Sequence, residues 1–279
     1  MRLTHLLSAL FLLLTLVPSG ATAQNDAHAF VGVNVIPMDR ERVLTDQTVV
    51  VERGIITAIG PASATAIPAG ATRIEARGQY LIPGLADMHV HLEYFETPAM
   101  LELFTAHGVT FVRNMDGRPH ILEWKEAIAR GTLEGPAIHT AGPLLDGSPP
   151  ALPDNTIVRT PDEARSAVAE QQAAGYDFIK VYTNLSTKAY EAILEEANAR
   201  GIPVAGHVPI AMDAEEASEL GISSIEHLDG IDLACSSASP AARRDHSSRP
   251  ARAISKRVPI ACAAIRVIID GPGVARRPL

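Results

Sequence analysis

From residue 80 onward, short apolar runs alternate with amphipathic stretches that end in glycine. The apolar runs cover residues 80–91, 109–117, 136–143, 178–183, 203–209 and 223–229. The stretches with helical periodicity cover residues 97–108, 120–131, 160–175, 186–201 and 211–221. Strands and helices that alternate in this way predict a parallel sheet covered by helices, which is an α/β fold. Because no glycine-rich phosphate loop follows a strand, a (β/α)8 barrel of the TIM type fits better than a dinucleotide-binding sheet.

Residues 24–80 have a different pattern, with short β-branched runs and turns in place of helices. Valine and isoleucine are concentrated in residues 29–38 and 48–60, and Arg53 and Gly54 supply a turn inside the second run. Such runs predict strands. The chain of 279 residues is long enough for one large domain or two small ones. We therefore expect a small β domain resembling a sandwich, followed by the barrel from about residue 81.

The first 23 residues are interpreted as a secretory signal peptide. Arg2 precedes an apolar run, and Ala21, Thr22 and Ala23 provide the small residues of a cleavage site. The run is short for a membrane span, although an uncleaved anchor is the alternative. No later part of the sequence is long and apolar enough to span a membrane. We expect export to the periplasm or the outside of the cell, with cleavage near Ala23.

Residues 236–279 differ in composition from the rest of the chain. Arginine, alanine, proline and serine dominate, and residues 241–279 carry nine basic and two acidic side chains although the whole chain has a net charge of −8. The basic residues have no aromatic residues between them, so the segment does not predict nucleic-acid binding. The alternating pattern stops near residue 235. We therefore expect residues 81–235 to form six of the eight strands of an incomplete barrel, and we interpret the tail as out-of-frame translation or the end of a pseudogene.

Side chains that could bind a metal ion are concentrated at the ends of the expected strands, where parallel barrels carry their active sites. His89 and His91 end the first strand, and because side chains at i and i+2 point to the same side, their imidazoles face one spot. The other polar candidates at strand ends are Asn114, Asp116, His139, Lys180, His207 and His227. Since imidazole is the commonest side-chain ligand of zinc, this pattern predicts a metal site.

Lys180 lies inside the apolar run FIKVYT, where an ammonium group is costly to bury. Loss of the proton removes this cost. A neutral amine can add carbon dioxide to give a carbamate, an anion whose two oxygens could bridge two metal ions. The alternative interpretation is a lysine whose ammonium group reaches solvent or an acidic partner.

The order of these motifs resembles the amidohydrolase superfamily, and most of all its imidazolonepropionase-like and prolidase-like branch. The resemblance extends from about residue 30 to about residue 232. It is carried by YLIPGLADMHVHL, GVTFVRNMDG, GPAIHTAGP, FIKVYTNLS, VAGHVP and SIEHLDG.

The resemblance implies both the ligands and the reaction. His89 and His91 would bind one ion, a carboxylated Lys180 would bridge two ions, and His207 and His227 would bind the second. The ions in this superfamily are usually zinc. They activate a water that hydrolyses a carbon–nitrogen bond, here of an amide or of a dipeptide such as X-Pro.

Several further polar residues have expected positions near this site. Tyr182 shares a strand face with the predicted lysine ligand and could contact a small-molecule or dipeptide substrate, and His139 could polarise the carbonyl group of that substrate. Asp87 and Glu226 lie close to predicted histidine ligands and could orient their ring nitrogens, or they could be solvated carboxylates. Arg113 is expected to pack on the outside of the barrel.

The aspartate that this superfamily places at the end of its eighth strand has no clear counterpart. Asp270, in VIIDGPG, is the one candidate, at an unfavourable spacing. Three functions therefore stay open: an active amidohydrolase, a catalytically inactive, truncated remnant that still binds metal in part, and a binding protein of another kind that uses a barrel-like scaffold. An oligomer of identical chains is compatible with the sequence, which does not identify the substrate.

Overall fold

The structure, a computed structural model, describes residues 27–235, which divide into two compact units between Pro83 and Gly84. The expected signal peptide, the basic tail and Asp270 lie outside the described residues. Within residues 27–235, no helix is both long and apolar enough to cross a membrane.

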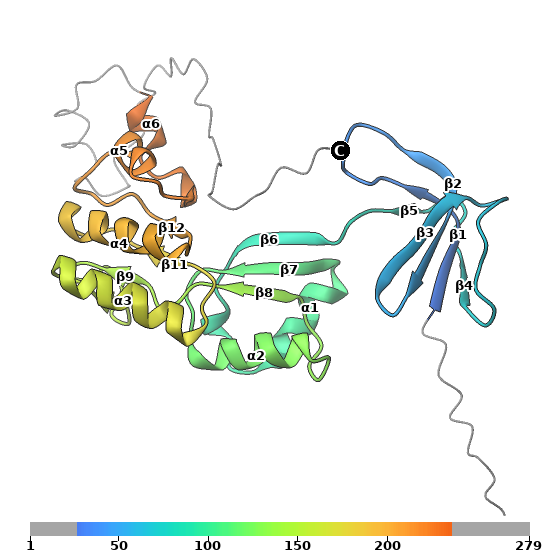
Figure 1. Ribbon diagram of the computed structural model, residues 1–279, viewed down its shortest axis with the longest axis horizontal. Helices are drawn as coiled ribbons and strands as arrows, with labels where there is room; N and C mark the ends of the chain where they lie inside the picture. The colour runs from blue at the N-terminus through green and yellow to red at the C-terminus, as the bar shows by residue number, and fades with distance from the viewer. Residues whose placement is uncertain (1–26, 236–279) are drawn as a thin grey trace, which may run out of the picture. The chain divides into compact units, whose positions relative to one another are not determined.

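The first unit is a five-stranded sheet (Figure 1). Its strands are β1 (Ala27–Val35), β2 (Leu44–Glu52), β3 (Ile55–Pro61), β4 (Thr72–Glu75) and β5 (Tyr80–Leu81). The order is β3-β2-β1-β4, with β5 also paired to β1. Arg53 and Gly54 form the predicted turn between β2 and β3, and both have the positive φ that a two-residue hairpin favours. The described residues of this unit form one layer, so the second layer of a sandwich stays a prediction.

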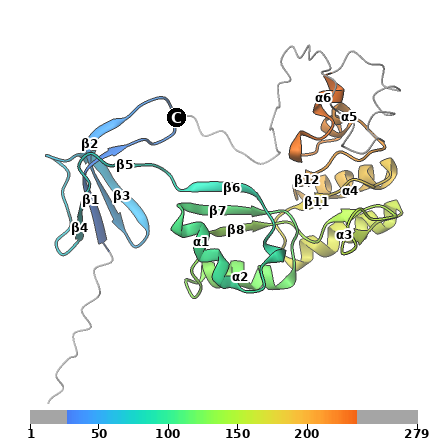
Figure 2. The ribbon, with the colours of Figure 1, turned by 180° about the vertical axis from the view of Figure 1, so that it is seen from behind.

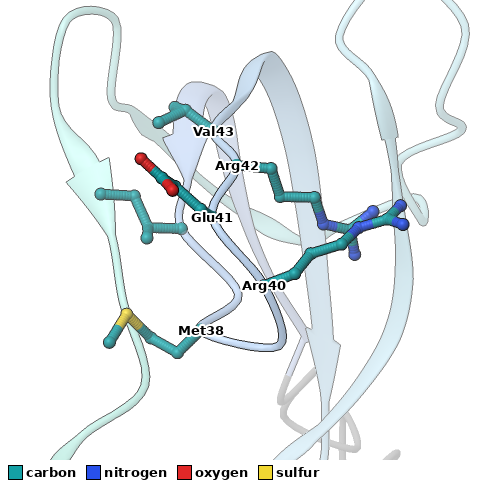
Figure 3. Close-up of a pocket in the computed structure, with 6 residues that line it drawn as sticks. Met38, Arg40, Glu41, Arg42 and Val43 are labelled. Atoms are coloured by element: carbon teal, nitrogen blue, oxygen red, sulfur yellow. The ribbon is translucent and has the colours of Figure 1, made fainter.

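Buried aliphatic side chains on β1 and β2 stabilise this sheet on both of its faces. They are Ala29, Val31, Val33, Val35, Val49 and Val50. A surface hollow of about 430 Å³ lies on the connection from β1 to β2. There the side chains of Arg40 and Arg42 reach to one side of the loop and those of Met38 and Glu41 to the other (Figure 3). None of the predicted site residues lines this hollow.

The second unit is built on parallel strands. They are β6 (Leu85–Val90), β7 (Val109–Asn114), β8 (Ala137–Thr140), β9 (Leu145–Asp146), β10 (Thr156–Ile157), β11 (Ile179–Val181), β12 (Val204–Gly206) and β13 (Ser224–Ile225). One sheet has the order β6-β7-β8 and the other β10-β9-β11-β12-β13. A parallel bridge between Ala141 and Phe178 joins the end of β8 to the start of β11. A strand therefore occurs in each of the six predicted strand regions, and β9 and β10 are added inside the proline-rich connection.

Helices cover one side of each sheet (Figures 1 and 2). They are α1 (Leu101–Ala106), α2 (Pro119–Ala129), α3 (Pro161–Ala174), α4 (Thr187–Arg200), α5 (Ala214–Glu219) and α6 (Ile231–Ala234), with short 3-10 turns η1 (Leu92–Tyr94), η2 (Pro98–Met100) and η3 (Glu226–Leu228). Val112 and Ile138 face α1 and α2 in one apolar core, while Ile179 and Val181 face α3 and α4 in another. Strand side chains that alternate with these positions therefore point to the opposite face of each sheet, away from the helices, which we call the interior.

Local sequence explains where α3 and α4 begin and end. The side chains of Thr160 and Ser186 accept hydrogen bonds from the backbone three residues later, which satisfies N–H groups that have no partner inside the helix. Gly175 and Gly201 end the two helices with φ of 92° and 69°, a backbone conformation that costs glycine little.

Two of the apolar runs are divided between different elements. The run 80–91 is divided at Pro83 and Gly84, so that its first part pairs with β1 in the first unit and its second part becomes β6. The run 223–229 is a strand only at Ser224–Ile225 and continues as a 3-10 turn.

Candidate active site

The structure brings four predicted histidines together at the carboxyl ends of the parallel strands. His91 follows β6, His207 follows β12 and His227 lies in η3 just after β13. The ring centroids of His89 and His227 are 4.5 Å apart, those of His89 and His91 are 5.4 Å apart, and those of His207 and His227 are 5.0 Å apart. We call these four residues the histidine cluster.

A β-bulge in β6 sets the directions of His89, on this strand, and of His91, just after it. The register pairs Asp87 with Val112 but Val90 with Asn114, so that β6 has one residue more than β7 across this interval. The backbone N–H of His89 donates to Asp87 Oδ1 at 3.2 Å. Beyond the bulge, Val90 packs into the helix-facing core, and the histidines on either side of it point to the interior.

Three rings of the cluster are held through the same atom, Nδ1. His89 Nδ1 lies 2.7 Å from Glu226 Oε2, and His91 Nδ1 lies 2.6 Å from Glu93 Oε1. His207 Nδ1 lies 2.9 Å from Thr183 Oγ1 and 3.3 Å from a carboxylate oxygen of Asp229. Because an ionised carboxylate can only accept, Nδ1 carries the proton where it faces one, which leaves the lone pair of Nε2 available for a metal ion.

His227 reaches the cluster through an unusual backbone conformation. Its φ is 57° and that of Leu228 is 60°. Residues other than glycine adopt this left-handed region at a cost of order 1–3 kcal/mol, and such strain is found most often at functional sites. The strained turn places the His227 ring next to the rings of His89 and His207.

Lys180 lies on the interior side of β11 and is 1% exposed. Burial lowers the pKa of its amine to about 8, and the charge of Arg113 acts in the same direction, while the carboxylates of Glu226 and Asp229 partly oppose it. A substantial fraction of the amine is therefore neutral near pH 8. Lys180 lies near the histidine cluster, since its charge contributes to a lowered pKa of His89 and of His207.

The interior position also sets the protonation of the histidine cluster. Burial lowers the pKa of His207 to about 3, with further contributions from the charges of Lys180, His227 and His89. Burial likewise lowers the pKa of His89, although its hydrogen bond with Glu226 acts against this. Neutral imidazole is the form that binds a metal ion.

Two tyrosines border the cluster. The ring of Tyr182 lies 4.1 Å from that of His207, and that of Tyr94 lies 5.8 Å from that of His91. Burial raises the pKa of Tyr182, as does the charge of Asp146. Tyr94 is 73% exposed, so its ring is free to meet a ligand that approaches the cluster.

His139 lies apart from the histidine cluster in its ring contacts. Its ring stacks on Phe178 at 5.4 Å and on Phe111 at 6.2 Å, and its Nδ1 lies 3.7 Å from Asp177 Oδ2. Burial lowers the pKa of His139, and the charge of Asp177 partly opposes this. The predicted contact of His139 with a substrate carbonyl stays a prediction.

The expectation that Arg113 packs outside the barrel is wrong. Its guanidinium group donates from Nη2 to Glu226 Oε1 at 2.7 Å, and its side chain is only 16% exposed. The helix-facing position on this strand belongs to Val112 instead. Of the two carboxylates expected to orient ring nitrogens, Glu226 does so for His89, whereas Asp87 accepts from a backbone N–H.

Asn114 and Asp116 support the site from β7 and the loop after it. The fully buried Asn114 accepts from the backbone N–H of Leu92 at 2.8 Å and donates to Thr140 Oγ1 at 3.0 Å, which ties the ends of β6, β7 and β8 together. Asp116 pairs with Arg118 through both carboxylate oxygens, at 2.6 and 2.9 Å. Burial raises the pKa of Asp116 to about 6 despite the charge of Arg118.

Sequence reasoning did not assign roles to Glu93, Thr183 or Asp229. Each of them holds a ring of the cluster from the turn or loop that follows a strand. Glu93 comes two residues after His91, and Asp229 comes two residues after His227, so a carboxylate at this spacing was the available signal. This spacing does not predict which ring the carboxylate contacts: Asp229 contacts the ring of His207 and not that of His227.

The chemistry of these residues fits a metal ion. Within residues 27–235, no three His, Cys, Asp or Glu side chains converge closely enough to form a complete ligand set. The donors themselves are suitable, because four imidazoles lie next to a buried lysine and three of the rings are oriented through Nδ1. Carboxylates that hold the far nitrogen of an imidazole are the usual outer partners of histidine ligands.

Comparison with known proteins gives consistent matches. A sequence profile of the amidohydrolase family matches residues 80–242. Adenine deaminase 2 of Bradyrhizobium sp. (strain ORS 278) is 29% identical over 192 residues, which are 63% of this chain and 31% of that protein. The crystal structure of a proposed prolidase from Bifidobacterium longum has a TM-score of 0.62 and 26% identity, covering 73% of this chain and 54% of its own. For bottromycin amidohydrolase the TM-score is 0.64 and the identity 26%, covering 81% and 48%. The chain thus spans about a third of that curated relative and about half of those solved structures.

Proposed function

Because the chain belongs to the amidohydrolase family, we propose that it hydrolyses a carbon–nitrogen bond in a small-molecule or dipeptide substrate. Members of this family are generally metal-dependent. The observation that carries the proposal is the histidine cluster beside Lys180, with three rings held through Nδ1. No structural role requires four imidazoles and an amine at the same strand ends, and burying them without ligands costs free energy.

In this proposal the site residues divide into ligands and supports. His89, His91, His207, His227 and Lys180 hold Zn²⁺, as two ions. Bound zinc polarises a carbonyl oxygen and lowers the pKa of a coordinated water. Each carboxylate that faces Nδ1 keeps the proton on that nitrogen, so that Nε2 stays a donor to the metal.

Lys180 has the properties that carbamate formation requires. The neutral amine attacks the carbon of carbon dioxide, a carbon–nitrogen bond forms, and the proton on nitrogen passes to solvent. The lowered pKa of about 8 supplies neutral amine at a pH where most lysines are protonated. The product is an anion, which is easier to bury beside metal ions than an ammonium group.

The substrate class is proposed from the border of the site. Tyr182 lies against His207 and can contact a bound substrate, and Tyr94 offers an exposed ring next to His91. A similar solved structure is described as a prolidase, which makes X-Pro dipeptides the first compounds to test. From the signal peptide expected in residues 1–23, we also propose that this activity lies in the periplasm or outside the cell.

The test is metal content and turnover of the full chain. Purified protein is analysed for bound zinc and assayed on X-Pro dipeptides, N-acyl amino acids and adenine, with and without prior removal of metal by a chelator. We expect about two zinc ions and a chelator-sensitive release of amine or ammonia from at least one class. His107→Ala, which removes an exposed imidazole at the end of α1, is the matched control and should change neither quantity.

Two outcomes contradict this proposal. Zinc binding without turnover of any compound would support the catalytically inactive remnant instead. Turnover that survives complete removal of metal would show that the histidine cluster is not the source of the chemistry.

A further inference from the structure

The Arg113 side chain links three strands across the interior of the second unit. It starts on β7, and Nε donates to the backbone oxygen of Met88 on β6 at 2.7 Å. Nη1 donates to Ser224 Oγ on β13 at 3.1 Å, and Nη2 donates to Glu226 Oε1 at 2.7 Å. The guanidinium carbon also lies 5.9 Å from the ring centroid of Phe178. All three nitrogens of the guanidinium group therefore have partners.

The bulge in β6 makes the first of these contacts possible. Met88 lies between the paired positions Asp87 and Val90 and is itself outside the register with β7. Its carbonyl oxygen can therefore accept a side-chain donor. A planar guanidinium group presents several N–H groups in fixed directions, whereas a lysine ammonium is a compact charge that cannot reach three separate acceptors in this way.

The Glu226 carboxylate connects the Arg113 guanidinium group to the histidine cluster. Its Oε1 accepts from Arg113 and, at 2.7 Å, from Ser224 Oγ, while its Oε2 faces His89 Nδ1 at 2.7 Å. One oxygen is thus anchored by two donors and the other meets the imidazole. The carboxylate is 7% exposed, so water competes little for these bonds.

Glu226 lies in a different sheet from the two residues that it joins, since Arg113 is on β7 and His89 is on β6, whereas Glu226 directly follows β13. β6 belongs to the sheet β6-β7-β8 and β13 to the sheet β10-β9-β11-β12-β13, and within the described residues no strand pairing joins β6 to β13. His89 and Glu226 are 137 residues apart in sequence. The orientation of the His89 ring therefore depends on side chains that span the interior and not on a shared strand ladder.

We propose that Arg113 is a positioning residue that fixes the Glu226 carboxylate, and through it the proton on His89 Nδ1 and the direction of Nε2. This inference rests on the proposed function, since it is the metal site that gives the direction of Nε2 its purpose. The fixed directions of the Arg113 N–H groups, as well as the charge of this side chain, hold the Glu226 carboxylate in place. Ser224 contributes one of the two donors that hold Oε1 and should matter less.

The first measurement is independent of metal. Nitrogen NMR of the histidine rings in metal-free protein reports which nitrogen of His89 carries the proton. Wild type should have the proton on Nδ1, whereas Arg113→Met and Arg113→Lys should populate both tautomers. Lys125→Met is the matched control, because it breaks another partly buried ion pair, with Asp177 at 2.6 Å, away from the cluster. It should leave the His89 tautomer unchanged.

The second measurement is Co²⁺ binding to the full chain. The protein is titrated with Co²⁺, and the visible absorption of the ion reports binding. Loss of an outer partner of a metal ligand typically weakens binding about 10–100-fold, so both Arg113 variants should bind Co²⁺ that much more weakly and with a changed spectrum. Ser224→Ala should have a smaller effect, and Lys125→Met none. If Arg113→Met does not fold, Arg113→Lys still decides the question, since it keeps a cation at the same position.

The outcomes separate the two proposals. A wild-type His89 tautomer in a folded Arg113 variant would overturn the positioning role, whether or not Co²⁺ binds. A wild-type chain that binds no Co²⁺, together with a changed tautomer in the variants, would leave the positioning role standing and remove the metal site on which the proposed function depends.

Discussion

Replacing Lys180 by methionine should stabilise the metal-free protein at neutral pH. The substitution keeps an unbranched side chain of similar length and removes an ammonium group that is 1% exposed. Burial lowers the pKa of this group from 10.5 to about 8, which means that folding disfavours its charged form. Glu226 keeps Arg113 and Ser224 as partners in the variant, so no carboxylate is left without a donor.

The size of the effect follows from the pKa difference. One pKa unit corresponds to about 1.4 kcal/mol, so a drop from 10.5 to about 8 costs the folded state about 3 kcal/mol. Because the folded protein holds the Lys180 proton less tightly than the unfolded chain, this cost is complete below pH 8. It shrinks as the pH rises from 8 to 10.5, and it vanishes above that value.

The assay is urea unfolding of both proteins in metal-free buffer without carbon dioxide, between about pH 6 and 10.5. Lys180→Met should be more stable by about 3 kcal/mol at pH 7, with a melting temperature about 6–12 °C higher for a domain of this size. Lys188→Met, on the exposed side of α4, is the control and should change stability by less than about 0.5 kcal/mol. A Lys180→Met variant no more stable than wild type at pH 7, or a difference that does not shrink toward pH 10.5, would refute the reasoning.

Four further predictions test other parts of the site. His89→Ala or His91→Ala should remove most bound zinc by elemental analysis, and full occupancy in the double variant would rule out this pair as ligands. Lys180→Ala should lose the bridged pair of ions and regain part of it with added bicarbonate or short carboxylates, whereas an active Lys180→Arg variant would contradict the carbamate. Asp146→Ala should lower the free energy of unfolding by at least about 3 kcal/mol, because the fully buried carboxylate accepts from three backbone N–H groups and an amide side chain. Urea unfolding measures this loss, and a loss below about 1 kcal/mol would count against the prediction. Since burial lowers the pKa of His207 to about 3, its ring signals in NMR should not move between about pH 7.5 and 5 in metal-free protein, and a midpoint in that range would contradict its burial.

The sequence alone determined the order of the strands and helices and the positions of the candidate ligands. Both depend on local properties: the period of the apolar residues, and the rule that the carboxyl ends of parallel strands meet at one edge. These properties sufficed to select His89, His91, His207 and His227, whose rings lie together in the structure. They also identified Lys180 as a costly group to bury.

The tertiary structure decided which way the remaining side chains point and which partners they meet. Arg113 faces the interior because its neighbour on β7, Val112, takes the helix-facing position, and successive side chains of a strand point to opposite faces. The carboxylate of Asp229 contacts the ring of His207, and that of Glu226 contacts the ring of His89. In sequence, however, Glu226 directly precedes His227 and Asp229 follows it by two residues. Such pairings depend on how the strands are placed around the interior, and no local pattern carries that information.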